Sequence, residues 1–212
     1  MGQAELQPCR YTPEEYFALE ERSEVRHEYF NGEVFAMAGA SVIHNLIKGN
    51  FIASLRPAVK QRGCRYVDEN VRLAVMEKSF YTYPDVIVSC DPADRRDSYT
   101  WRYPVLIVEV LSPFTADYDR TTKFENYQKM PSLRHYLLVS QAAWTVEWYR
   151  RDEAGQWIYT LLIGPDATLE IPDMGLVLPL RELYEDTDVA PLLVLPGAAK
   201  DTSPAQRSSG LR

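Results

Sequence analysis

The sequence has few cysteines and no long apolar run, and each shortage excludes a class of protein. Its 212 residues contain three scattered cysteines, Cys9, Cys64 and Cys90, and no C-x-x-C pair. Neither a zinc site nor a disulfide framework is therefore indicated, and a reducing cytoplasm fits best. No apolar run is long enough to span a membrane, and no signal peptide is recognisable at the N-terminus.

Positive charge is also scarce. The chain has 23 Lys and Arg residues against 30 Asp and Glu residues, a formal net charge of -7. This balance gives no support to a broad electrostatic grip on nucleic acid, although a local basic surface can coexist with acidic residues elsewhere. The motifs G-x-G-x-x-G, G-x-x-x-x-G-K-[ST] and G-x-S-x-G are all missing. A nucleotide-binding enzyme and a serine hydrolase are therefore poorly supported.

The apolar content is sufficient for one domain. Hydrophobic residues make up 46% of the chain, enough for a proper core over this length. We interpret residues 1–10 as an N-terminal lead-in and residues 11–190 as the folded domain. Residues 197–212 are small and polar, which predicts a disordered C-terminal tail. We find no internal repeat and no interdomain linker.

Two short apolar runs, residues 83–88 and 105–111, organise the rest of the chain. Each is rich in β-branched residues and carries one carboxylate, Asp85 in the first and Glu109 in the second. Such runs are typical of strands buried on both faces, where a carboxylate is costly unless it meets a cation. If the strands are antiparallel neighbours, the carboxylates meet at one sheet edge, where a divalent metal relieves their repulsion.

The N-terminal half predicts two helices and a hairpin. Thr12, followed by proline and two glutamates, is a strong helix start, and the helix should end near residue 21. Asn31-Gly32 predicts a two-residue turn between strands at 26–30 and 33–38. That turn places Glu28 and Glu33 on one face, either as solvated side chains or as part of a site. A helix from Ser41 to about residue 61 carries His44 in its first turn.

The remaining segments complete a mixed α/β pattern. Residues 64–75 should form a strand interrupted at 68–70, and residues 91–102 a solvated basic loop. Residues 117–130 should form a helix on which Arg120, Lys123 and Tyr127 share one stripe. A buried strand is expected next, then a hairpin, two short β segments and a short helix; their ranges are 134–140, 146–151, 157–163, 167–171, 176–178 and 180–184.

Six segments, in this order and spacing, carry a resemblance to a known family. They are YTPEEY at 11–16, HEYFNGEV at 27–34, HNLI at 44–47, YPDV at 83–86, EVLSP at 109–113 and DRTTKFENY at 119–127. The chain resembles the bacterial restriction endonuclease-like family of the Uma type, within the PD-(D/E)xK nuclease superfamily. The resemblance covers about residues 11–185. It implies an α/β (α+β) restriction-endonuclease-like core, in which helices flank a central mixed β-sheet.

The resemblance also implies a metal-dependent site. Asp85, Glu109 and the carbonyl of Val110 would hold Mg²⁺ or Mn²⁺ through oxygen ligands. The usual signature places a lysine two residues after the glutamate, where this chain has Leu111. Lys123, on the following helix, is expected to replace that lysine. Either Glu28 or Glu33 would complete the acidic cluster, which His44 and Tyr127 would line.

The function implied is hydrolysis of phosphodiester bonds in DNA. The alternative is a nuclease fold that no longer cuts and serves as a binding module, which Leu111 and the acidic net charge favour. A structural salt bridge of Glu109 with Lys123 or Arg120, and a core role for Tyr127, are the alternative interpretations of those residues. A homodimer would pool weak basic patches, and four tryptophans are candidates for its interface or for the core: Trp101, Trp144, Trp148 and Trp157.

Overall fold

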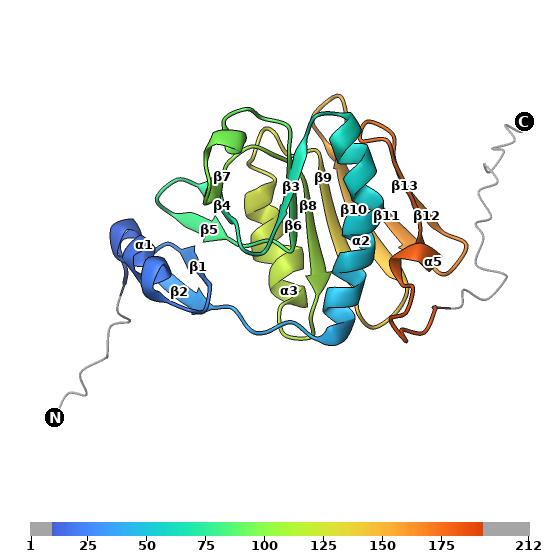
Figure 1. The fold of residues 1–212 in the computed structure, drawn as a ribbon, viewed down its shortest axis with the longest axis horizontal. Coiled ribbons are helices and arrows are strands. Elements are labelled where there is room, and N and C mark those ends of the chain that lie inside the picture. Colours follow the sequence, from blue (N-terminus) through green and yellow to red (C-terminus); the bar gives the residue numbers. More distant parts are fainter. Residues whose placement is uncertain (1–9, 193–212) are drawn as a thin grey trace, which may run out of the picture.

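The structure is a computed structural model that describes residues 10–192 (Figure 1). The lead-in expected at residues 1–10 lies outside this range except for its last residue, and the tail expected at 197–212 lies wholly outside it. No helix within the range combines the length and the apolar character needed to cross a membrane.

The strands of the described part form three sheets. The first sheet has the spatial order β2 (Glu33–Ala36), β1 (His27–Phe30), β5 (Phe80–Thr82), β4 (Arg72–Met76) and β7 (Thr100–Trp101). The second has the order β11 (Trp157–Ile163), β10 (Thr145–Arg151), β9 (His135–Ser140), β8 (Pro104–Leu111), β6 (Val86–Ser89) and β3 (Arg65–Asp68). The third pairs β12 (Thr168–Ile171) with β13 (Leu176–Pro179).

Helical segments connect and cover these sheets. They are α1 (Pro13–Arg22), α2 (Val42–Gln61), the 3-10 turn η1 (Asp94–Arg96), α3 (Ala116–Tyr118), the π-helical turn η2 (Asp119–Lys123), α4 (Phe124–Tyr127) and α5 (Leu180–Leu183). In Figure 1, α2 runs along one face of the six-stranded sheet.

The six-stranded sheet is the central mixed sheet that the sequence predicts. Its strand β8 pairs in parallel with β9 and antiparallel with β6. All four residues of β6 are buried, as are seven of the eight residues of β8. A strand in this position is covered on both faces, which explains its nearly continuous apolar sequence. The expected fold class is therefore confirmed.

Two apolar layers enclose this sheet. On one face, Phe51 and Leu55 of α2 pack with Val86 and Val108 and with the β12–β13 unit. On the other face, Ile107 joins a second cluster that includes Tyr127 and residues of the five-stranded sheet. Burying one such side chain contributes roughly 1.5–3 kcal/mol, so the two layers fix the central strands firmly.

Local sequence signals explain how the flanking elements begin. Thr12 and Glu15 form the expected capping box at the start of α1. Asn31 and Gly32 both have positive φ, 49° and 95°, as a two-residue hairpin turn requires. The register of the hairpin follows from this turn: Phe30 lies opposite Glu33 and Glu28 opposite Phe35, so Glu28 and Glu33 share one face as predicted.

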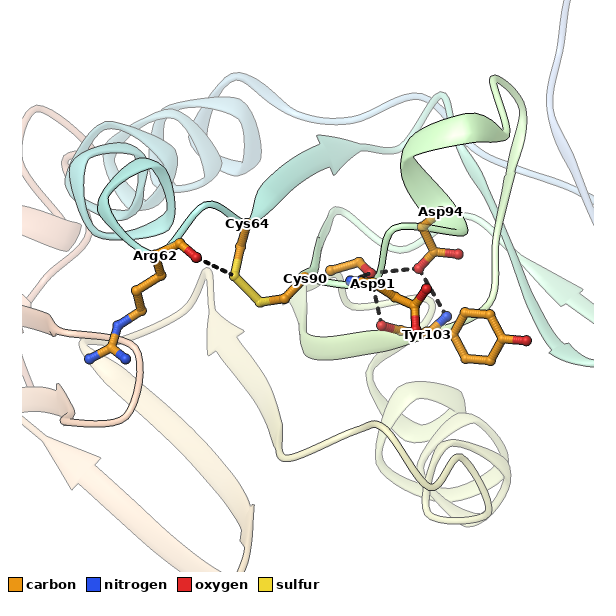
Figure 2. Close-up of a disulfide and its surroundings, with 7 residues drawn as sticks. Arg62, Cys64, Cys90, Asp91, Asp94 and Tyr103 are labelled. Atoms are coloured by element: carbon orange, nitrogen blue, oxygen red, sulfur yellow. Dashed lines mark hydrogen bonds between the residues drawn. A yellow bond between two sulfur atoms is a disulfide. The ribbon is translucent and has the colours of Figure 1, made fainter.

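The cysteines correct one sequence-based prediction. Cys64 and Cys90 form a disulfide, although no disulfide framework was expected from three scattered cysteines (Figure 2). The reason is strand register: Arg65 of β3 lies opposite Ser89 of β6 in an antiparallel pair. The next pair outward is Cys64 and Cys90, which places the two side chains within bonding distance. This proximity arises only when β3 and β6 pair, so the spacing of cysteines along the chain does not reveal it.

We expect the double variant Cys64→Ala/Cys90→Ala to lose about 3 kcal/mol of unfolding free energy. The disulfide joins residues 26 positions apart, and closing a loop of that length removes about this much conformational free energy from the unfolded chain. Urea unfolding of both proteins without reductant measures the difference. With dithiothreitol present, the parent should fall to the stability of the variant; a gap that persists in reductant would contradict a disulfide origin.

Candidate active site

Asp85 and Glu109, the two carboxylates singled out in the sequence, lie at the same end of the neighbouring central strands β6 and β8. Val86 of β6 lies opposite Val108 of β8 in an antiparallel pair. The next positions toward the edge are Asp85 and Glu109, one from each strand. Because β6 begins only at Val86, the amide of Val110 lies beyond the regular ladder between the two strands. That amide donates instead to Asp85 Oδ2, at 2.6 Å.

His44 makes a second contact to the same oxygen. Its Nε2 lies 3.1 Å from Asp85 Oδ2. The side chain is placed by the start of α2, where the Ser41 hydroxyl accepts a hydrogen bond from the His44 amide and caps the helix. The other ring nitrogen, Nδ1, is buried and has no hydrogen-bond partner among the described residues. His44 therefore orients the Asp85 carboxylate from the helical layer.

Glu109 is a buried carboxylate with two donors. Its side chain projects from β8 at the center of the sheet, and the residue is only 4% exposed. Oε1 accepts hydrogen bonds from Lys123 Nζ and from the Tyr127 hydroxyl, both at 3.1 Å. The Tyr127 hydroxyl also lies 3.1 Å from the Thr82 hydroxyl, so the ring is fixed from β5 as well.

Lys123 lies among three carboxylates. Its Nζ is 3.1 Å from Glu28 Oε1, 3.1 Å from Glu109 Oε1 and 3.0 Å from Asp119 Oδ1. The residue is 6% exposed, so solvent screens these charges only weakly. One ammonium cannot neutralise three carboxylates. The cluster therefore holds an excess of negative charge in a poorly solvated place, where a further cation would be attracted.

Sequence reasoning missed Asp119. It predicted a regular helix at 117–130, on which Arg120 shares a stripe with Lys123 and Tyr127. The structure instead inserts the π-helical turn η2, and buried side chains recur at Asp119, Lys123 and Tyr127, four residues apart. Arg120 points away from the site and pairs with Glu147 at 2.7 Å. The only signal for Asp119 was its spacing of four from Lys123, which suits an ion pair on one helix face.

The charge excess shifts the protonation equilibria of the cluster. Burial raises the pKa of Glu109 well above its ordinary value of 4.5; Lys123 opposes this shift, and Asp119 and Asp85 add to it. For Lys123, burial alone would lower the pKa, but Glu109 and Glu28 outweigh burial and raise it well above 10.5. Lys123 therefore stays an ammonium at neutral pH, whereas the Glu109 carboxyl holds a proton more readily than usual.

Except for Tyr127, which was expected to line the site but is fully buried behind Glu109, these side chains line a single cavity of about 660 Å³. Its charged lining consists of Glu28, Glu69, Asp85, Glu109, Asp119 and Lys123. His44 and Val110 also line it. Glu33 does not: it is exposed on β2, two residues before Phe35, which lies opposite Glu28 and faces the cavity. Of the two glutamates that the sequence offered, the structure brings Glu28 to the cluster.

The donor set suits a hydrated divalent cation. Within residues 10–192, no three Asp, Glu, His or Cys side chains converge as a ready-made metal cage, because Lys123 occupies the center of the carboxylates. Mg²⁺, however, commonly uses one or two carboxylates and keeps several waters. Asp85 and Glu109 supply that number. The carbonyl of Val110 points to the same side of β8 as its amide, which reaches Asp85. These residues therefore fit such an ion.

Two known proteins have sequences that align with most of this chain. It is 35% identical over 175 residues to "Uncharacterized protein slr1290" from Synechocystis sp., a match that covers 82% of this chain and 92% of the relative. It is 34% identical over 165 residues to "Uncharacterized protein sll1609" from the same organism, covering 77% and 93%.

A solved structure has the same fold. The crystal structure of a "putative nuclease belonging to DUF820" from Anabaena variabilis superposes with a TM-score of 0.69 at 22% identity, covering 82% of this chain and 97% of that one. The model of the Uma2 family, described as "Putative restriction endonuclease", matches residues 13–195. That range contains the whole cavity cluster. The chain therefore belongs to the Uma2 family of restriction endonuclease-like proteins.

Proposed function

We propose that this protein is a metal-dependent endonuclease that hydrolyses phosphodiester bonds in DNA. One observation carries the proposal: Lys123, from a helical segment, is buried against Glu109 although Leu111 occupies the usual lysine position. Leu111 packs in the apolar layer and cannot bind a phosphate. A buried ammonium is costly to maintain, so its place beside the Glu109 carboxylate suggests a catalytic rather than a packing role.

Each residue of the cluster would then have a distinct task. Asp85, Glu109 and the Val110 carbonyl would hold Mg²⁺ or Mn²⁺. When bound, the cation would supply Lewis-acid polarisation of the phosphodiester. Lys123 would stabilise the negative charge that develops on the phosphate during the reaction.

The remaining residues would keep this geometry. His44 would hold the Asp85 carboxylate in place, and the Tyr127 hydroxyl would hold that of Glu109. Glu28 and Asp119 would keep Lys123 protonated and aimed at the cavity. Fixed groups of this kind gain their effect because little reorganisation is needed at the moment of reaction.

A binding module without catalysis is the second candidate. It is favoured by the three carboxylates around Lys123, which occupy its donors when no phosphate is present. In that case the protein would bind DNA, and neither Mg²⁺ nor Mn²⁺ would change the DNA or the affinity. Binding measured by isothermal titration, with and without the metal, separates the two candidates.

We expect Glu28→Gln to lower cleavage of plasmid DNA roughly 10- to 100-fold in Mn²⁺. The reason is that Glu28 orients Lys123, and the loss of such a supporting partner typically has an effect of this size. The measurement is the rate of conversion of supercoiled plasmid to nicked and linear forms. Glu33→Gln is the matched control: it lies on the same hairpin, outside the cavity, and should cut at the parent rate.

Two outcomes would contradict this part of the proposal. One is cleavage by the parent that persists in EDTA, which would remove the metal from the mechanism. The other is equal loss in the Glu28→Gln and Glu33→Gln proteins, which would point to a general effect of the hairpin rather than to the cluster.

A further inference from the structure

Strand β11 is an unprotected edge of the central sheet. It is the last strand in the order of the six-stranded sheet and, within residues 10–192, pairs with β10 alone. Its seven residues, WIYTLLI, include no charged residue, proline or glycine. Three large apolar side chains on it are exposed: Ile158 by 37%, Tyr159 by 51% and Leu161 by 44%. An edge of this kind offers unpaired backbone groups and apolar surface together.

The other edges of the two larger sheets in the described part are defended. β3, at the opposite edge of the same sheet, has only four residues and carries Arg65 and Asp68 at its ends. In the five-stranded sheet, β2 has four residues and begins with Glu33, and β7 has two residues. Short length and charge are the usual means of preventing edge-to-edge association. β11 is seven residues long and carries no charge, so nothing in its own sequence prevents another strand from pairing with it.

The sequence of β11 suits a second copy of itself. If two copies pair antiparallel about Thr160, Tyr159 lies opposite Leu161 and Ile158 opposite Leu162. Aromatic–aliphatic and aliphatic pairs of this kind stabilise a sheet. Self-pairing about a two-fold axis brings like residues close together, so any charge near the axis would repel its own copy. The absence of charge from β11 removes this obstacle.

We propose that two copies of this protein associate through β11 and form one continuous twelve-stranded sheet. The pairing is isologous: the same strand contributes the same surface from both subunits. The backbone groups left unpaired at the edge of each monomer would be satisfied across the axis. The exposed apolar side chains of β11 would be buried at the same time.

Strand directions fix where the two cavities would lie. β8 is parallel to β9, and β10 is antiparallel to both β9 and β11, so β11 runs parallel to β8. Antiparallel pairing of two β11 strands therefore turns the two β8 strands in opposite directions. Because the two β8 strands run in opposite directions, the two cavities would open at opposite strand ends of the joint sheet. They would be separated across the sheet by seven strand spacings, or about 34 Å. This dimer would therefore not place its two cavities against the same base-pair step of one DNA duplex.

Charge variants at Leu161 test the pairing. Leu161→Lys and Leu161→Glu place like charges close together across the axis in each homodimer. Each should raise the dimer dissociation constant at least about tenfold, as measured by sedimentation or light scattering across a concentration series. An equimolar mixture of the two variants places opposite charges there and should restore a dimer. Val177→Lys is the control, because Val177 is exposed on the separate β12–β13 sheet.

The readout is oligomeric state, so the result does not depend on whether the protein cuts DNA. Circular dichroism verifies that each Leu161 variant is folded. A parent that stays monomeric at high micromolar concentration would overturn the proposal, as would a dimer that survives both variants or a mixture that fails to associate. A chain ended after Leu192 that dimerises when the full chain does not would also overturn it, by assigning the edge to residues 193–212.

Discussion

Asp85→Asn should reduce DNA cleavage on the order of 10³-fold, the scale of loss when one member of a catalytic group is removed. The amide that replaces the carboxylate keeps the shape of the side chain but loses a negative charge and one of two acidic metal ligands. His44 and the Val110 amide would still find an oxygen to bond. We therefore expect a folded protein whose affinity for Mn²⁺ and cleavage rate both collapse.

The comparison that tests this result uses a second aspartate near the site. Asp117 lies on α3, two residues before Asp119, and is exposed outside the cavity. Asp117→Asn removes the same charge from the chain and should cut DNA at the parent rate. Calorimetric titration with Mn²⁺ provides a readout independent of cleavage. Full activity in the Asp85→Asn protein would exclude Asp85 from the site and the mechanism with it.

Lys123→Met should destabilise the fold by about 3–5 kcal/mol at pH 8. The methionine preserves an unbranched apolar stem but removes the ammonium, and Glu28, Glu109 and Asp119 are left as buried carboxylates without a cation. Breaking a buried ion network by removing one partner has costs of this size, because the remaining charges stay desolvated. Urea unfolding followed by circular dichroism measures the change. Cleavage should be lost in the same protein.

The pH dependence distinguishes this cause from a packing defect. In the parent, the pKa of Lys123 is raised above 10.5 in the folded state, so its stabilisation is complete at pH 5.5 and at pH 8. The pKa of Glu109 is raised above 4.5, so the folded state holds a proton that the unfolded state has released. This contribution to stability weakens as the pH rises from the pKa of Glu109 in the unfolded chain to its higher pKa in the folded protein. Without Lys123 the pKa of Glu109 in the folded protein rises further, so the pH range between its unfolded and folded pKa values widens.

The deficit of Lys123→Met should therefore be larger at pH 8 than at pH 5.5. Lys60→Met, at an exposed position near the end of α2, should change stability by no more than about 0.5 kcal/mol at either pH. An equal deficit for Lys123→Met at both pH values would mean that the lost ammonium is not what destabilises the protein.

The sequence predicts most of the fold because its strongest signals are local. Asn31-Gly32 determines both the turn and the register of its hairpin, and Thr12 determines where α1 begins. The apolar runs around Asp85 and Glu109 are long enough to identify buried strands. These features depend on neighbouring residues alone, so the physics that forms them is visible in a short window.

The geometry of the candidate site is visible in the sequence only in part, because it depends on contacts between distant segments. The sequence could not choose between Glu28 and Glu33, since both project from one face of the hairpin. The choice follows from how β1 packs against the helical segment that carries Lys123. The disulfide likewise follows from the pairing of β3 with β6. Pairings of this kind are tertiary, and no local pattern specifies them.

The π-helical turn has a consequence for which positions determine the cavity in this protein. A π turn contains one residue more than the corresponding α turn, so it rotates everything before it about the helix axis relative to everything after it. Asp119 and Lys123, four residues apart, would be neighbours on a regular α-helix as well, so the additional residue acts mainly on the segment before the turn, where Tyr118 lines the cavity. Loss of either Thr121 or Thr122 would leave every acidic and basic group of the cluster in the polypeptide, yet would rotate the residues before the turn, including the cavity-lining Tyr118, relative to Lys123 and Tyr127. Chain length between 119 and 123 is thus as much a determinant of the site as the identity of the residues at its ends.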